Sequence, residues 1–259
     1  MFKEKLKNKQ MSFNQENTEH IFFERLPSTN DYMQKLARDK KLQEGTVVWT
    51  NFQTQGKGHG KNTWESEEGK NLLMSILLKP PSFDAAGQFQ ISRIISLALV
   101  DLVDKYCRPV TIKWPNDIML DRKKIAGILI ENTIIDGKIS ESVAGIGLNV
   151  NQVDFPVYIP NPTSMKKEAG CHFDILNILK ELIRFIESWY TKLLKGENRL
   201  IEKSYEKVLY GFRKELAFDE GGRSFSAKII GVGPGGHLIL EIPGGEIREF
   251  GFKEVSFKL

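Results

Sequence analysis

The amino-acid sequence predicts an α+β fold followed by a small β-barrel. Between residues 20 and 150, β-branched and apolar segments of strand length alternate with turns. Two long stretches, 89–106 and 174–194, carry apolar residues at helical spacing. From Lys214 onward, short strand-like segments alternate with glycine-rich turns, a pattern typical of small barrels. A chain of 259 residues with 41% hydrophobic content can form one or two domains with a real core.

The first half of the chain contains most of the predicted strands. Ser28 or Thr29 caps a helix that reaches about Asp39, between the first two strands. Residues 89–106 form a long core helix. The predicted strands of this half are 20–27, 45–53, 71–78, 110–114, 118–121, 124–131 and 142–150.

The second half begins with helices and ends with strands. A strongly amphipathic helix is predicted at 174–194, and a second helix at about 199–211. The predicted barrel strands are 224–231, 237–242, 246–251 and 254–259. We therefore divide the chain into a flexible extension (1–19), a main domain (20–212) and a C-terminal domain (213–259).

Composition and charge favour a cytoplasmic enzyme over a membrane or nucleic-acid-binding protein. The net charge is +4 and the basic residues do not cluster, so specific nucleic-acid binding is not expected. The most apolar run, 94–103, is interrupted by polar residues and cannot span a bilayer, and the polar N-terminus lacks the apolar stretch of a signal peptide. Cys107 and Cys171 have no CxxC spacing and are expected to be buried, reduced thiols.

Three short stretches carry residues suited to activating a carboxylate with ATP. The glycine loop QTQGKGHGKNTW (53–64) can wrap an anion with backbone N–H groups and neutralise it with lysines. In KWPND (113–117), Asn116 and Asp117 offer oxygen ligands to Mg²⁺. In the adjoining KKIAGILIE run, Lys124 precedes small residues that admit a closely approaching ligand. The third stretch is GIGLNV (145–150).

The order and spacing of these stretches resemble the biotin protein ligases, which attach biotin to a lysine of a carrier protein. The similarity runs from Ser28-Thr29-Asn30 to about residue 165 and resumes weakly near the C-terminus. It implies a catalytic domain like that of class II aminoacyl-tRNA synthetases, with a mixed, mostly antiparallel sheet and flanking helices, followed by an SH3-like barrel. It also implies that MgATP converts biotin to biotinyl-5′-AMP, from which a lysine of a biotin carboxyl carrier protein, such as that of acetyl-CoA carboxylase, takes biotin.

The resemblance also implies roles for individual residues. Lys124 would contact the biotin carboxylate and the α-phosphate and act in catalysis with Asp117, which would also hold Mg²⁺. The residues expected at biotin are Ser28, Thr29, Asn30, Gln53, Gly56, Lys57, Gly58, His59, Lys124, Gly127 and Ile128. Those expected at ATP or the adenylate are Lys57, Trp64, Asn116, Asp117, Lys124 and Asn149. The chain departs from the family at Lys57 and His59, where arginine is usual, so the bidentate guanidinium fork is absent.

Each of these residues also has a purely structural interpretation. The glycine loop can be a hairpin tip, Ser28 and Thr29 can cap a helix, and Lys124 can belong to a solvated charged turn. Gln53 can end an exposed strand, Asn116-Asp117 can form a simple turn, and Asn149 can bond its own strand end. Trp64 can be a core aromatic residue.

Two other functions compete with a biotin ligase. A lipoate ligase of the same superfamily uses a similar carrier, although KWPND followed by KKIAGILIE favours biotin. A biotin-responsive repressor would require a helix-turn-helix module, and only about twenty polar residues precede the first predicted strand. The GxGxxG pattern at 231–236 is set aside, because a strand and not a helix is predicted after it.

Overall fold

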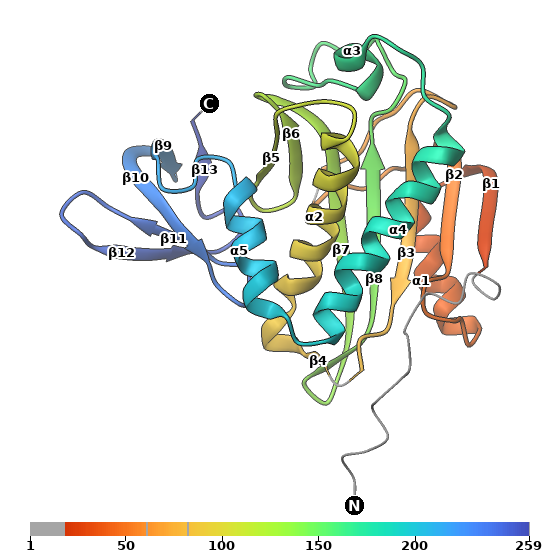
Figure 1. The fold of residues 1–259 in the computed structure, drawn as a ribbon, viewed down its shortest axis with the longest axis horizontal. Helices are drawn as coiled ribbons and strands as arrows, with labels where there is room; N and C mark the ends of the chain where they lie inside the picture. Colours follow the sequence, from red (N-terminus) through yellow and green to blue (C-terminus); the bar gives the residue numbers. More distant parts are fainter. Residues whose placement is uncertain (1–18, 61, 82, 259) are drawn as a thin grey trace, which may run out of the picture.

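A computed structural model describes residues 19–60, 62–81 and 83–258. The predicted extension 1–19 lies outside these residues except for Glu19, and so does Lys61 of the glycine loop. The main part of the molecule is an eight-stranded mixed sheet in the order β1-β2-β3-β8-β7-β6-β5, with β4 paired to β8 (Figure 1). A five-stranded sheet in the order β12-β11-β10-β9-β13 forms the C-terminal part. The fold is therefore α+β, as predicted.

The large sheet is mixed because its first pair is parallel and all its other pairs are antiparallel. The parallel pair is β1 with β2, joined by α1 as the crossover helix. The strands of the large sheet, listed with α1, are β1 (His20–Leu26), α1 (Thr29–Asp39), β2 (Val47–Gln53), β3 (Leu72–Leu78), β4 (Phe83–Asp84), β5 (Val110–Lys113), β6 (Asp117–Leu120), β7 (Lys123–Ile135) and β8 (Lys138–Leu148). β3 is buried along its whole length, as its sequence predicts, because every residue except Ser75 is apolar.

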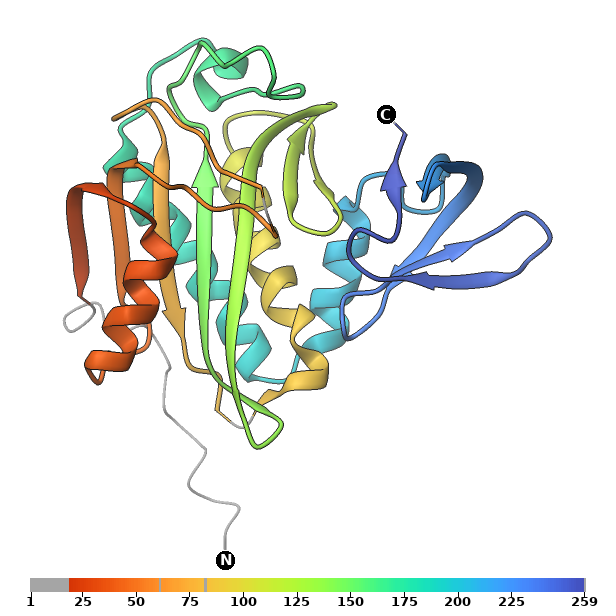
Figure 2. The same cartoon turned by 180° about the vertical axis from the view of Figure 1, so that it is seen from behind.

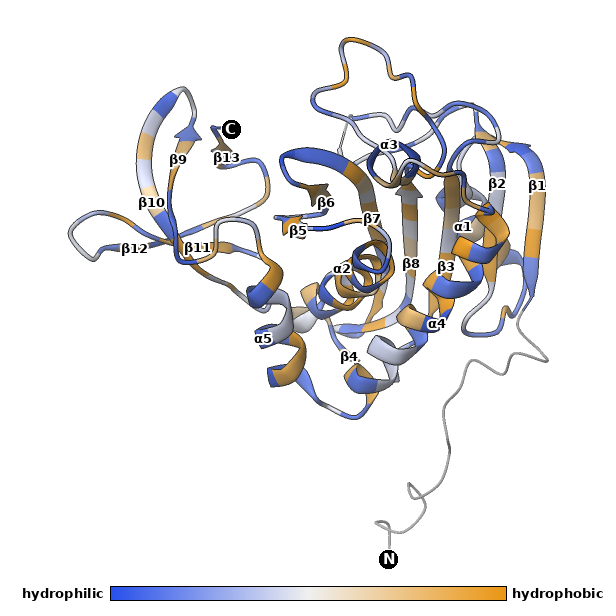
Figure 3. Cartoon of the chain, turned by 45° about the horizontal axis from the view of Figure 1, so that its top comes forward, coloured by the Kyte–Doolittle hydropathy of each residue, from blue (hydrophilic) through white to orange (hydrophobic). Residues whose placement is uncertain are grey.

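Helices cover both faces of this sheet. On one face lie α2 (Phe89–Asp104), α4 (Ile175–Leu194) and α5 (Asn198–Val208), and on the other lies α1, as the two opposite views show (Figures 1 and 2). Successive side chains of β3 point to opposite faces of the sheet. Met74 and Ile76 belong to the core between the sheet and helices α2 and α4, and Leu77 belongs to the smaller core between the sheet and α1. Helix α2, which carries much of the hydrophobic colour in Figure 3, is buried on nearly all sides and packs against α4 and α5, whereas α4 buries one apolar stripe.

Helix α2 also accounts for the one segment of the described chain that is apolar and long enough to cross a membrane. This segment, Ala85–Asp104, includes the short 3₁₀ turn Ala85–Gly87. Inside the protein, 72% of its most apolar window is buried. Such burial is typical of a core helix, which is the role that the sequence predicts.

The C-terminal sheet contains β9 (Glu215–Glu220), β10 (Arg223–Val232), β11 (Leu238–Glu241), β12 (Ile247–Phe250) and β13 (Ser256–Phe257). All its pairs are antiparallel. Its buried residues, such as Phe218 and Leu240, belong to the same core cluster as α2 and α5. Trp114 Nε1 donates to the Gly236 carbonyl at 2.8 Å, which ties the turn after β5 to the β10–β11 loop. The C-terminal sheet is thus packed on the main one.

Several local expectations were wrong or incomplete. Strands β4 and β9 and the short helix α3 (Met165–Ala169) were not predicted. Ser164 caps α3 through the Lys167 N–H, and Gly170 ends it at φ 74°, so both boundary signals are in the sequence. The two cysteines were expected to be buried, but only Cys107 is, because Cys171 lies in the exposed turn after α3.

Candidate active site

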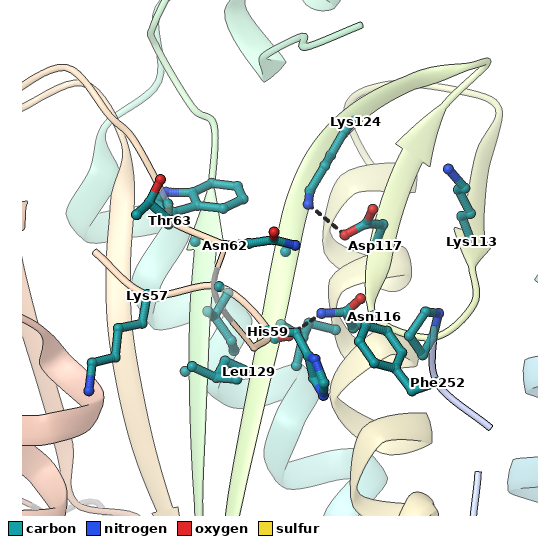
Figure 4. Close-up of a pocket in the computed structure, with 18 of the residues that line it drawn as sticks. Lys57, His59, Asn62, Thr63, Lys113, Asn116, Asp117, Lys124, Leu129 and Phe252 are labelled. Atoms are coloured by element: carbon teal, nitrogen blue, oxygen red, sulfur yellow. Dashed lines mark hydrogen bonds and ion pairs between the residues drawn. The ribbon is translucent and has the colours of Figure 1, made fainter. Parts of the chain in front are cut away.

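A cavity of about 400 Å³ lies between the start of α1, the glycine loop, strands β7 and β8, the turn after β5 and the C-terminal segment 252–257 (Figure 4). Its volume is in the range of small-molecule binding sites. The predicted site residues that line it are Ser28, Thr29, Asn30, Gln53, Lys57, Gly58, His59, Trp64, Asn116, Asp117, Lys124, Gly127 and Ile128. The fold therefore brings together residues that lie a hundred positions apart in the sequence.

Lys124 and Asp117 form an ion pair on the cavity wall. Lys124 Nζ lies 2.6 Å from Asp117 Oδ1, and both side chains are about a third or less exposed (Figure 4). The backbone of Lys124 is fixed by the segment after β8, because its N–H donates to the Asn161 carbonyl and its carbonyl accepts from Thr163. Asn116 is fixed in turn by two bonds to the Ile128 backbone, at 2.8 and 3.0 Å. The Lys124 ammonium group is thus held in one position and still lines the cavity.

Trp64 lies flat over two glycines of the sheet. Gly127 of β7 and Gly147 of β8 are register partners, and a Cβ on either would lie less than 3.0 Å from indole atoms. Lys124 Nζ lies 5.5 Å from the Trp64 ring centroid. The indole N–H is buried and has no partner within the described chain. Gly127 of the KKIAGILIE run and Gly147 of GIGLNV therefore leave the space that the Trp64 indole occupies, and this indole closes one side of the cavity.

A chain of hydrogen bonds ties the start of α1 to the sheet. Gln53 Oε1 accepts from the Thr29 N–H at 2.8 Å and from the Thr29 hydroxyl at 3.0 Å. Ser75, fully buried on β3, lies 2.8 Å from Thr29 Oγ1 and donates to Asn30 Oδ1 at 2.6 Å. The Asn30 amide donates to the Leu129 carbonyl and to Glu131 Oε2. Ser28 caps α1 through the Asp31 N–H, so capping and cavity lining coincide here.

Replacing Ser75 with alanine is expected to lower the free energy of unfolding by about 1–3 kcal/mol, because Asn30 Oδ1 would lose its donor in a buried place. Urea unfolding measures this change. The matched control is Ser96→Ala, since the Ser96 hydroxyl is also fully buried but has no partner in the described chain. Equal losses in the two variants would contradict the supporting role of Ser75.

The glycine loop is a hairpin with contacts that the sequence did not predict. The Gly58 N–H donates to the Asn62 carbonyl at 2.8 Å, and the Trp64 N–H to the Gly56 carbonyl at 2.9 Å. The His59 ring lies 3.6 Å from the Phe252 ring, centroid to centroid, so an aromatic residue of the C-terminal segment anchors the tip. Burial and the nearby Lys253 lower the pKa of His59, which keeps this ring neutral at neutral pH.

Ligand binding is expected to order the unpaired part of this loop. Within the described residues, the N–H groups of His59 and Gly60 have no hydrogen-bond acceptor, whereas that of Gly58 does. Ordering costs about 1–2 kcal/mol per residue, and only a ligand with a phosphate can satisfy both these N–H groups and the loop's charge. Because the resemblance implies an adenylate ligand, hydrogen exchange should show stronger protection of His59 and Gly60 with biotinyl-adenylate than with biotin alone. Equal protection in the free and the adenylate-bound protein would show a static loop.

The cavity carries an excess of positive charge. Lys57, Lys113, Lys124 and Lys253 line it, against one carboxylate, Asp117. Lys57 Nζ is already paired with Asp31 at 2.6 Å and points away from Asp117 and Lys124 (Figure 4). Lys113 and Lys253 have no carboxylate partner within the described chain, and burial lowers the pKa of Lys113. An anionic ligand is what this arrangement favours.

Two predicted site residues do not line the cavity. Gly56 lies at the base of the hairpin, where a Cβ would overlap the Trp64 carbonyl. Asn149 is buried behind Lys124 and donates to the Thr163 carbonyl at 2.9 Å, so it holds the segment that fixes the Lys124 backbone. Its Oδ1 is buried and has no partner within the described residues. In this structure the two residues contact the hairpin and the segment after β8 and do not contribute to the lining.

The donors present are compatible with a magnesium ion bound together with phosphates. Mg²⁺ commonly takes one or two carboxylates, with waters and substrate phosphates completing its octahedron. Asp117 supplies one carboxylate, and the Asn116 amide oxygen lies on the same turn. No cluster of three His, Cys, Asp or Glu occurs within the described chain, so a metal cage made by the protein alone is not formed there.

Sequence reasoning missed several residues of the cavity wall. Lys113, Gly145 and Gly147 lie inside the KWPND and GIGLNV stretches, so these motifs already contained the signal. Phe252, Lys253 and Phe257 also line the cavity, and no sequence pattern indicated them. They reach it only because the C-terminal sheet packs beside the turn after β5.

A family model described as the biotin/lipoate A/B protein ligase family matches residues 22–151, which is half of the chain. A biotin–[acetyl-CoA-carboxylase] ligase of Paracoccus denitrificans is 31% identical over 176 residues, 65% of this chain and 72% of that protein. The bifunctional ligase/repressor BirA of Bacillus subtilis is 29% identical over 225 residues, 85% of this chain and 69% of the relative.

Solved structures agree on the fold. A biotin protein ligase from Aquifex aeolicus, in complex with biotin and ATP, superimposes with a TM-score of 0.76 at 24% identity, over 93% of this chain and 98% of that one. The Leishmania major biotin protein ligase with biotinyl-5-AMP gives a TM-score of 0.62 at 23% identity, over 90% of this chain and 99% of that one. The chain belongs to the biotin/lipoate A/B protein ligase family, among its biotin protein ligases. The resemblance stated from the motifs is thereby confirmed.

Proposed function

We propose that this protein activates biotin with MgATP and transfers it to a lysine of a biotin carboxyl carrier protein. The observation that carries the proposal is that one cavity is lined both by uncharged hydrogen-bonding groups and by the Lys124–Asp117 pair with further cations. The named relatives are consistent with this activity. The same proposal treats residues 20–212 as a class II synthetase-like catalytic domain and 213–259 as an SH3-like domain of a cytoplasmic enzyme.

The uncharged end of the cavity suits the ureido ring of biotin. Gln53 Oε1 already accepts two bonds from Thr29, so the Gln53 amide N–H groups remain available for an acceptor such as the ureido carbonyl. The Ser28 oxygen accepts from the Asp31 N–H, which leaves its hydroxyl proton free to donate to the ligand as well. Asn30 is different, because both its amide hydrogens and its oxygen are used within the protein.

The charged end suits the reaction centre. In the first step, a carboxylate oxygen of biotin attacks the α-phosphorus of ATP, and the bond to the departing pyrophosphate breaks. Lys124 would stabilise the charge that develops on the α-phosphoryl oxygens. Lys113 and Lys253, which have no carboxylate partner within the described residues, also line the cavity. Mg²⁺, held in part by Asp117, would supply further neutralisation of the phosphates.

In the second step, the carrier's lysine amine attacks the acyl carbon of the adenylate, the acyl–phosphate bond breaks and AMP leaves. No side chain of this protein becomes covalently modified, so its contribution is positioning and electrostatic stabilisation. The Trp64 indole and the hairpin that carries His59 would shield the anhydride from water before the carrier arrives.

Pyrophosphate release with MgATP and either biotin or lipoate tests the first step. We expect release with biotin and not with lipoate, and the reverse would favour the lipoate ligase alternative. Mass spectrometry of a carrier domain after incubation with protein, biotin and MgATP tests the second step. A carrier in which the acceptor lysine is replaced by arginine is the control, and failure to modify the unaltered carrier would refute the transfer proposal.

A further inference from the structure

A second cavity, of about 200 Å³, lies on the other side of the turn after β5. Its walls come from the first half of α2, from β7 and from two C-terminal segments, residues 235–237 and 251–252. The helix and strand periods decide which side chains line this cavity. Ser92 and Ser96 lie one turn apart on α2, and Ile128, Ile130 and Asn132 are every second residue of β7. None of the site roles described above accounts for this cavity.

The lining of the second cavity contains no carboxylate, ammonium or guanidinium group. No aspartate, glutamate, lysine or arginine contributes to it, and its ionisable groups are His59 and His237. The lowered pKa of His59 keeps that ring neutral at neutral pH. Phe89, Trp114 and Phe252 supply flat apolar surface. A charged ligand would lose its hydration here without gaining a counter-charge, so the cavity selects against ions.

Two oxygen atoms at this cavity are buried without a partner in the described chain. They are the hydroxyl of Ser96, which is fully buried, and Asn132 Oδ1. The Asn132 amide nitrogen is occupied, since it donates to Gln88 Oε1 at 3.2 Å. Buried polar atoms in native proteins nearly always have a partner. Asn132 Oδ1 requires a donor, and the Ser96 hydroxyl can donate or accept.

We propose that the second cavity binds a small uncharged molecule that combines a flat apolar body with an amide or hydroxyl group. A primary amide matches the two oxygens, because its NH₂ can donate to Asn132 Oδ1 while its carbonyl accepts from Ser96. The apolar body would lie against Phe89, Trp114 and Phe252. The volume is below that of drug-sized ligand sites, which limits the ligand to about ten non-hydrogen atoms.

The two cavities share a wall, so an occupant of one should influence the other. His59, Asn116, Ile128 and Phe252 line both, together with the Trp114-Pro115 pair. The contact between the His59 and Phe252 rings lies in this wall. A molecule in the second cavity would hold Phe252 in place and with it the tip of the glycine loop. This coupling rests on the proposed function, whereas binding to the second cavity does not.

Benzamide and benzoate are the probes, since they have nearly the same shape and differ in charge. In chemical-shift titrations of the whole protein, we expect benzamide to shift the resonances of Asn132 and Phe252. Its dissociation constant should be on the order of 1 mM, because so few non-hydrogen atoms limit the binding free energy. Benzoate should not shift these resonances. No binding of benzamide up to tens of millimolar, or equal binding of benzoate, would refute the site.

The Ser96→Ala variant should weaken benzamide binding by about tenfold through the loss of one hydrogen bond. Alanine is favourable in a helix, so this variant should fold, and its thermal unfolding verifies that. Ser66→Ala is the matched control, because the Ser66 hydroxyl also lacks a partner in the described chain but lines neither cavity. Equal benzamide affinity in both variants would contradict the assignment.

The coupling is measured as the dissociation constant of biotin with and without saturating benzamide. A change of at least twofold that disappears in Ser96→Ala supports it, and no change shows that the sites are independent. If biotin does not bind at all, the proposed function fails while the benzamide titration still decides whether the second cavity is a binding site.

Discussion

Replacing Lys124 with alanine is expected to lower pyrophosphate release in the presence of biotin and MgATP by about 10²–10³-fold, the effect of losing one preorganised stabilising group. The physical reason is the position of Nζ on the cavity wall, 2.6 Å from Asp117 Oδ1. Without this cation, the Asp117 carboxylate would face an incoming phosphate unpaired. Stability should change little, because a partly exposed ion pair contributes about 0–1 kcal/mol.

The neighbouring lysine offers a matched control for this experiment. Lys123 Nζ pairs with Glu168 at 3.1 Å, its side chain is about half exposed, and it does not line the cavity. Lys123→Ala should therefore retain nearly the full rate of pyrophosphate release. If Lys124→Ala retained it too, the assignment of Lys124 to the reaction centre would be wrong.

Replacing Gly145 with alanine is expected to damage both biotin binding and folding. Gly145 lies on β8 opposite Ser75 of β3 and Leu129 of β7, and a Cβ there would overlap the Asn30 side chain. Asn30 would have to leave its bonds to Ser75 and Glu131, and the start of α1 would shift with it. Overpacking of this kind lowers the free energy of unfolding by about 1–3 kcal/mol. Loss of alignment at Ser28 and Thr29 should weaken biotin binding by about tenfold or more, the effect of one lost hydrogen bond to a buried group.

Urea unfolding and a biotin titration measure the two effects, and Gly231→Ala is the control. Gly231 also lies within a strand, β10, but its added Cβ would meet only Ile239 Cδ1, at an ordinary 3.8 Å. That variant should be nearly neutral in both measurements. A Gly145→Ala protein with unchanged stability and biotin affinity would show that the Asn30 arrangement is not required.

Much of the fold follows from periodicity in the sequence. The helix at 174–194 was predictable because its apolar stripe is long and unbroken, and β3 because every residue in it is apolar or small. Strand β9 was not predictable, since ELAFDE has only one fully buried side chain and reads as a polar linker. The sequence analysis did not state the parallel pairing of β1 with β2, although the helix predicted between these strands already indicates a crossover connection.

Some residues of the candidate site were likewise indicated by the sequence, and others were not. Lys124, Asp117, Gln53 and Trp64 were expected at the site because their motifs resemble those of the biotin protein ligases, and all four line the cavity. Ser75 was overlooked within an apolar run, since its role depends on Asn30 lying above it. Asn149, which the resemblance places near the adenylate, is absent from the cavity lining and donates to the Thr163 carbonyl.

The sequence alone thus determined the α+β class, the order of most elements, the ligase family and the catalytic candidates, because local periodicity and short motifs are properties of neighbouring residues. Tertiary structure alone decided which of those candidates face one cavity and that Phe252 and Lys253 join them. It also decided that a second cavity, without carboxylate, lysine or arginine side chains, shares a wall with the first. These features arise from contacts between segments far apart in the chain, such as Trp114 Nε1 with the Gly236 carbonyl, and no local pattern encodes such a distance.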